Sequence, residues 1–115
     1  MPGIDAISRF VIFQGDSSPL WRIRIKNVDV SDCTCRQIVR TDLDTAAIFD
    51  EAVTDTVTDS DGMLWFLVSL TPTKTLQLTA NMTYLWIVQI ENVILDPPVR
   101  KETHSTLIVQ QQGAV

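Results

Sequence analysis

The residues that could do acid–base or nucleophilic chemistry in this 115-residue chain are few, and the histidine is the first to consider. His104 is the only histidine, so any Ser-His-Asp or Cys-His scheme depends on it. It lies near Glu102 in a segment rich in Thr and Ser, where a surface hydrogen bond is the simpler interpretation. The sequence has no glycine-rich phosphate loop, GxSxG elbow or HExxH motif. We therefore expect no catalytic residues and no enzymatic activity.

Carboxylates gathered between positions 42 and 61 are the second candidates for chemistry. Two carboxyl groups can hydrolyse a glycosidic bond, one as the acid and the other as the base or nucleophile. An isolated β-domain of this size rarely forms the deep cleft that such a reaction needs. A small polysaccharide hydrolase is therefore an alternative and not the main expectation.

Metal ligands do not occur at a productive spacing. The run Asp59-Ser60-Asp61-Gly62 matches only the start of a calcium loop, because the later ligands of an EF-hand are missing. Cys33 and Cys35 would point to the same face of a strand with Cα atoms about 6.5 Å apart, which is poor geometry for a disulfide. Zinc would need further Cys or His ligands. We expect free thiols, no metal and no cofactor.

Three tryptophans could supply an aromatic binding surface. Trp21, Trp65 and Trp86 could line a carbohydrate-binding face, and the candidate aromatic patch is Trp21 with Trp65. Trp65 and Trp86 lie inside apolar runs, so packing in the core is the competing interpretation. The two interpretations stay open at this level.

The elements that must position these side chains have the patterns of β-strands. Residues 20–26 alternate most clearly, with a tryptophan and two isoleucines on one face and three basic residues on the other. Residues 64–70 and 82–91 are apolar on both faces, which suits the core strands of a sandwich. Strands are predicted at residues 9–14, 20–26, 33–41, 48–57, 64–70, 82–91 and 100–110.

The connections carry turn signals. Asp61-Gly62 supplies the residues that a tight hairpin needs at positive φ. Thr71 as an N-cap and Pro72 at the first helical position predict one short helical turn near Thr71 and Lys74. Asn81 tolerates the left-handed conformation needed to enter the next strand.

Together these patterns predict an all-β, immunoglobulin-like antiparallel β-sandwich of about seven strands. We expect one domain over residues 1–115, with short extended termini at about 1–8 and 111–115. Residues 48–57 are rich in Thr and Val and are expected near a sheet edge. The candidate assembly edge consists of Ile48, Val53, Thr54 and Thr56.

Composition and charge restrict the partners. An apolar fraction of 45% with 20% charged residues is typical of a folded domain. A net charge of −5 argues against a nucleic-acid partner, which would need a basic surface. The sequence contains no signal-peptide pattern and no apolar run long enough to span a membrane, so we expect synthesis in a cytoplasm and no membrane partner.

The charges are also polarised along the chain. Most basic residues precede position 41, and an acidic run follows from Asp42 to Asp61. Such polarity could steer copies of the protein against one another, or it could be only a solvated surface.

Several short motifs together resemble a known family. They are the Gly15-Asp16 turn before the alternating strand from Trp21, the run Leu70-Thr71-Pro72-x-x-Thr75-x-x-Leu78, and Tyr84-x-Trp86-x-Val88. Between about Phe10 and Val109 the chain resembles small immunoglobulin-like β-sandwich proteins of tailed bacteriophages and prophages, which resemble the N-terminal domains of baseplate and tail-fibre proteins. Members usually have glycine just before the tyrosine strand, where this chain has Asn81.

The resemblance implies a structural component of a virion without catalytic residues, made in the host cytoplasm. Its partners would be other virion proteins and copies of itself, in a homo-oligomer or multi-copy assembly. The expected place is the tail, baseplate, neck or a fibre attachment. Capsid decoration and a carbohydrate-binding module are the alternatives.

Overall fold

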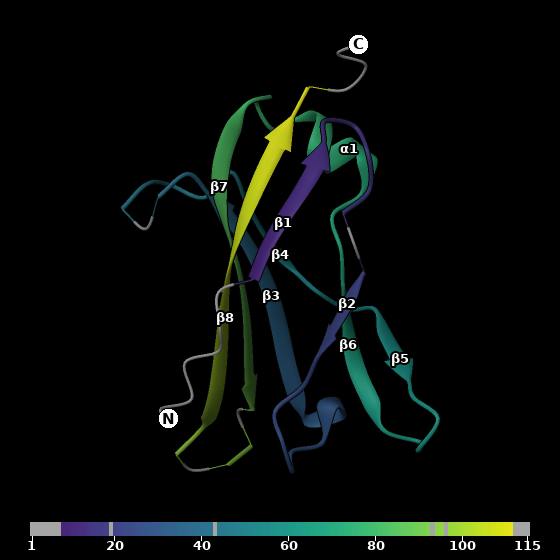
Figure 1. Ribbon diagram of the computed structural model, residues 1–115. Coiled ribbons are helices and arrows are strands. Elements are labelled where there is room, and N and C mark those ends of the chain that lie inside the picture. The colour runs from purple at the N-terminus through teal and green to yellow at the C-terminus, as the bar shows by residue number, and fades with distance from the viewer. Residues whose placement is uncertain (1–7, 19, 43, 93, 96, 112–115) are drawn as a thin grey trace.

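The computed structural model describes residues 8–18, 20–42, 44–92, 94–95 and 97–111. Eight strands occur in this part of the chain and form two sheets (Figure 1). The larger sheet has the order β1 (Ser8–Phe13), β8 (Val99–Gln110), β7 (Met82–Asn92), β3 (Cys33–Arg40) and β4 (Phe49–Ala52). The smaller sheet has the order β2 (Trp21–Ile23), β6 (Leu64–Val68) and β5 (Thr56–Thr58). A 3-10 turn, η1 (Val30–Asp32), precedes β3, and α1 (Pro72–Leu76) precedes β7.

The predicted fold class is confirmed. The third, seventh and eighth strands share one sheet and the second, fifth and sixth share the other, which is the strand distribution of an immunoglobulin-type sandwich. One pair differs from the antiparallel expectation, because β1 runs parallel to β8 with Ser8 opposite Ser105. No helix in the described part of the chain is long and apolar enough to cross a membrane.

The core is organised around Trp86, whose side chain is completely buried. Its ring makes edge-to-face contacts with Phe10 and Trp21, at centroid distances of 5.4 and 5.9 Å. Two residues earlier, the buried Tyr84 hydroxyl accepts a hydrogen bond from the backbone N–H of Thr79 at 2.7 Å. This is the tyrosine corner of immunoglobulin-type domains. Trp21 and Trp86 thus join the second and seventh strands where antibody domains carry a disulfide.

The predicted turns form as expected. Thr71 caps α1 by accepting a hydrogen bond from the N–H of Lys74 at 3.4 Å, and Pro72 is the first helical residue. Gly62 and Asn81 both have positive φ, at 80° and 65°. The Gly62 turn therefore joins β5 to β6 within the smaller sheet, and α1 with the Asn81 turn joins β6 to β7 of the larger sheet.

Residues 48–57 form two strands, where one strand near an edge was predicted. The chain leaves β4, passes between the sheets and enters β5. Val53 is buried at this crossing and donates its N–H to the carbonyl of Cys35 at 2.9 Å. Two residues later, the carbonyl of Asp55 accepts a hydrogen bond from Leu67 of β6 at 2.9 Å. Both strands are the last of their sheets, so the predicted edge position holds for each half.

Candidate interaction surface

The two tryptophans of the predicted aromatic patch lie on opposite faces of the smaller sheet. Trp21 points inward and packs on Trp86, with its sheet neighbour Ile23 buried on the same face. Trp65 belongs to the opposite set of β6, because Phe66 on its C-terminal side is buried in the core. The structure therefore does not bring Trp21 and Trp65 together, and only Trp65 is on the outer face.

The outer face of the smaller sheet is arranged in three stripes. Basic residues follow β2, apolar residues follow β6 and acidic residues flank the centre of β5, because side chains two apart in a strand share a face. Strand pairing aligns Arg22 with Leu67 and Val57 with Trp65, and backbone hydrogen bonds place Asp55 beside Leu67 and Asp59 beside Met63. Arg24 and Lys26 follow the last residue of β2 and line one cavity with Trp65 and Met63. We call this surface the striped face. Row by row, its members are Arg22, Leu67 and Asp55; then Arg24, Trp65 and Val57; then Lys26, Met63 and Asp59.

Trp65 is held in the middle of the striped face by charged neighbours. The guanidinium of Arg22 lies 4.5 Å from the centre of the Trp65 ring, and that of Arg24 lies 5.4 Å from it. Such cation–π contacts fix the indole and keep the apolar part of both arginines against the sheet. On the acidic side, the indole N–H donates to the carboxylate of Asp59 at 2.9 Å. The ring is thereby fixed between the basic and the acidic stripe.

Asp59 also organises the turn between β5 and β6. Its other carboxylate oxygen accepts hydrogen bonds from the backbone N–H groups of Asp61 and Met63 at 2.8 and 2.9 Å. The hydrogen bond from Trp65, followed by that from Met63, lowers the pKa of Asp59 below its ordinary value. The segment Asp59-Ser60-Asp61-Gly62, which resembles the start of a calcium loop, is therefore a turn in which the carboxylate of Asp59 accepts hydrogen bonds from three N–H groups.

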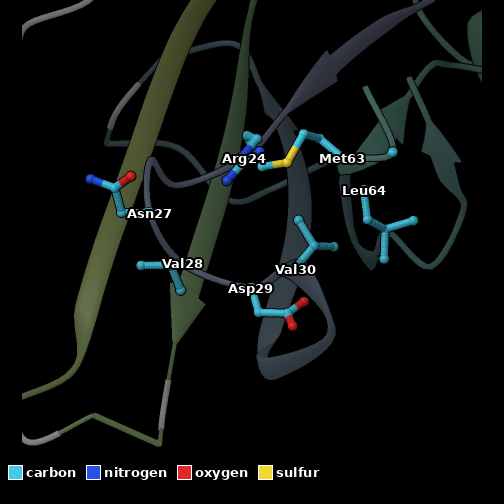
Figure 2. A pocket seen from close by; sticks show the side chains of 8 residues that line it. Arg24, Asn27, Val28, Asp29, Val30, Met63 and Leu64 are labelled. Atoms are coloured by element: carbon cyan, nitrogen blue, oxygen red, sulfur yellow. The ribbon is translucent and has the colours of Figure 1, made fainter. Parts of the chain in front are cut away.

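Two shallow cavities lie at the end of the striped face. One, of about 390 Å³, is lined by Arg24, Lys26, Met63 and Trp65 together with Lys101 from the larger sheet. The other, of about 400 Å³, separates the β2–β3 connection from the β5–β6 turn (Figure 2). Arg24 and Met63 line both cavities. The basic stripe thus continues across the gap between the two sheets to Lys101.

The residues of the predicted assembly edge are spread from the start of β4 to the start of β5. Ile48 is exposed, and its N–H donates to the carbonyl of Val39 at 2.7 Å. Val53 is buried, Thr54 is exposed, and Thr56 opens β5 opposite Phe66. These four residues therefore do not form one continuous strand edge.

The edge strands β4 and β5 are short and carry or adjoin charges. In β4, Asp50 pairs with Arg36, whose Nε lies 3.0 Å from the carboxylate, and Glu51 lies 3.1 Å from Lys74. Short strands and charged side chains are common protections against uncontrolled edge pairing. The outer face of the smaller sheet is consequently a better candidate for contact than either edge.

The residues considered for catalysis are dispersed. His104 contacts Glu102 on the outer face of the larger sheet, whereas Cys35 is buried on its inner face. The hydrogen bond from His104 is the main cause of a lowered pKa of Glu102. Burial raises the pKa of Cys35 to about 12 and also raises that of Cys33, so both thiols stay protonated. These groups do not converge on one site.

The acidic residues at 42–61 are likewise divided among different partners: Asp50 with Arg36, Glu51 with Lys74, and Asp59 with the indole of Trp65. Among the residues that the structure describes, no group of three or more potential ligands could hold a metal ion.

Comparisons of the chain with protein-family models, with curated proteins and with solved structures each returned no match.

Proposed function

We propose that this protein is a non-enzymatic structural component of a bacteriophage virion, in the tail, baseplate, neck or a fibre attachment. It works through contacts with other virion proteins and with copies of itself. The observation that carries this proposal is the striped face, which leaves apolar and charged side chains side by side on an open sheet surface. Aromatic residues and arginines are enriched at protein–protein contact sites, and the striped face has an aromatic residue at its centre beside two arginines.

The residues of the family resemblance support the proposal through their structural roles. The hydroxyl of Thr75 donates to the carbonyl of Asp16 at 2.7 Å and accepts from the N–H of Gly15 at 3.1 Å. Next to it, Ser18 and Leu70 exchange two hydrogen bonds of 3.0 and 2.6 Å. The Gly15-Asp16 turn and the Thr71-Pro72 turn are thus one unit. The motifs of the resemblance therefore build the scaffold, which is the role that a structural family would give them.

The carbohydrate-binding alternative has less support from the geometry. A sugar-binding platform needs an open aromatic face, and Arg22 and Arg24 already lie over the ring of Trp65. Trp21 points into the core. Capsid decoration differs from the main proposal only in the place of the protein on the particle, so the same experiment separates the two.

The experiment compares particles assembled with and without this protein. We expect particles that lack it to be incomplete at the tail, baseplate or neck, and wild-type protein supplied in trans to restore them. Electron microscopy would show the missing density and its position, and density lost over the head would favour decoration. Normal assembly with unchanged density would refute the proposal.

A further inference from the structure

The striped face is complementary to itself. Its basic stripe follows β2 at one edge of the sheet, and its acidic residues flank β5 at the other edge. The apolar stripe on β6 runs between them. When one copy is turned by 180° about an axis parallel to β6 and laid face to face on another, the basic stripe of each faces the acidic stripe of the other. A contact of this kind is isologous, and it closes with two copies.

We propose that two copies of this protein pair through their striped faces about a two-fold axis along β6. This inference deepens the proposed function, on which it rests, by naming the partner of the striped face as a second copy of the chain.

The rows decide which side chains meet. Because the axis is parallel to the strands, each row meets the same row of the other copy. Arg22 and Asp55 occupy opposite edges of the first row, since Arg22 pairs with Leu67 and the carbonyl of Asp55 accepts from Leu67. Arg22 of each copy therefore faces Asp55 of the other, and the contact occurs twice. Opposite charges juxtaposed in this way favour one partner and one register.

The third row gives a second complementary pair. Lys26 and Met63 line the basic cavity, and Asp59 donates its N–H to the carbonyl of Met63 at 2.9 Å from the other side. After the rotation, Asp59 of one copy approaches the cavity of the other, where Lys26 and Lys101 add to its positive charge.

The second row supplies the apolar centre. Val57 pairs with Trp65 across β5 and β6. Near the axis, Trp65 of one copy lies opposite Trp65 of the other, each ring with the guanidinium groups of Arg22 and Arg24 over it, while Val57 packs against the stem of Arg24. An aromatic centre with a charged rim is the arrangement in which contact residues contribute most to binding.

The small size of the face limits the strength of the pairing. Three strands of three to five residues span roughly 15 Å in each direction. The area of a face with these dimensions is well below the roughly 800 Å² per partner of a standard interface. We expect a weak dimer, detectable at about 0.1 to 1 mM protein. Many copies held together in a particle would strengthen such a contact through their high effective concentration.

The test uses sedimentation velocity of the purified protein across this concentration range. Arg22→Glu and Asp55→Lys each place like charges together twice, so each should weaken self-association at least about tenfold. An equimolar mixture of the two variants restores both pairs of opposite charge and should form a heterodimer. The double variant Arg22→Glu/Asp55→Lys should also dimerise. Arg36→Glu, on the exposed outer face of the larger sheet, is the matched control and should behave as wild type.

Three results would overturn the inference. They are a wild-type protein that stays monomeric throughout the range, a mixture of the two variants that stays monomeric, and an Arg36→Glu variant that loses association as fully as Arg22→Glu. Circular dichroism of each variant checks that the fold is kept. None of these outcomes touches the particle experiment, so a failure of this pairing is distinguishable from a failure of the proposed virion role.

Discussion

Replacing Thr75 by Val should remove the hydrogen bonds that join the Gly15-Asp16 turn to the Thr71-Pro72 turn at one end of the sandwich. Thr75 is completely buried, and valine has nearly the same shape without the hydroxyl. The substitution removes the donor to the Asp16 carbonyl at 2.7 Å and the acceptor for the Gly15 N–H at 3.1 Å. The backbone groups of the Gly15-Asp16 turn lose their partner, while the packing volume is unchanged.

The expected loss follows from these hydrogen bonds. A typical intramolecular hydrogen bond contributes about 1 kcal/mol net, and a polar group left without a partner costs about 1 to 3 kcal/mol. Gly15 and Asp16 are partly open to water, which can replace part of the loss. We therefore expect the free energy of unfolding to fall by about 2 kcal/mol. In a chain of 115 residues, this lowers Tm by about 8 °C.

Thermal and urea unfolding followed by circular dichroism measure the effect. Thr73→Val is the matched control, because Thr73 lies in the same helix and its side chain is exposed. The control should change the free energy of unfolding by less than about 0.5 kcal/mol. If Thr75→Val were no more destabilising than Thr73→Val, the coupling between the two turns would be wrong.

Three further predictions concern single groups. Tyr84→Phe removes the acceptor at the tyrosine corner and should lower the free energy of unfolding by about 1 kcal/mol in urea titrations; an unchanged midpoint would contradict it. Because burial raises the pKa of Cys35 to about 12, Cys35 should react with a thiol reagent at pH 8 far more slowly than Cys33, and equal native rates would refute the burial. Asp59 has a lowered folded-state pKa, so its stabilising effect is complete above its unfolded pKa and is lost as pH falls through the lower folded pKa. In a pH titration, the indole N–H resonance of Trp65 should therefore shift with a midpoint below 3.8, the ordinary pKa of an aspartate. A midpoint above 3.8 would contradict the assignment.

Local sequence was sufficient for the fold class and for most elements. The alternation at residues 20–26 places Ile23 and Ile25 in the core, as the period of two requires. The division of residues 48–57 was not predictable in the same way. Thr and Val favour a strand throughout, and only the distant partners of the two halves, β3 and β6, decide where the chain crosses. The parallel pairing of β1 with β8 also depends on contacts far apart in sequence.

The striped face was only partly visible in the sequence. The spacing of Arg22, Arg24 and Lys26 indicates a polar strand face. Trp65 lies in a run that is apolar on both sides, so its direction cannot be assigned without knowing which side of β6 is buried. The spacing of Asp55 and Asp59 around an apolar residue was a usable signal. Asp55 and Asp59 lie at the opposite edge of the same sheet from the basic residues because β6 lies between β2 and β5. No local sequence pattern determines this strand order.

The most direct test of the striped face is a concentration series of ¹H–¹⁵N spectra of the wild-type protein. Residues that enter a contact between copies change their chemical shifts as the protein is diluted. We expect the largest changes at the indole N–H of Trp65 and the backbone amides of Val57 and Leu67, with little change at Val11 and Phe13 on the outer face of the larger sheet. Changes centred on Val11 and Phe13, or spectra independent of concentration, would contradict this account.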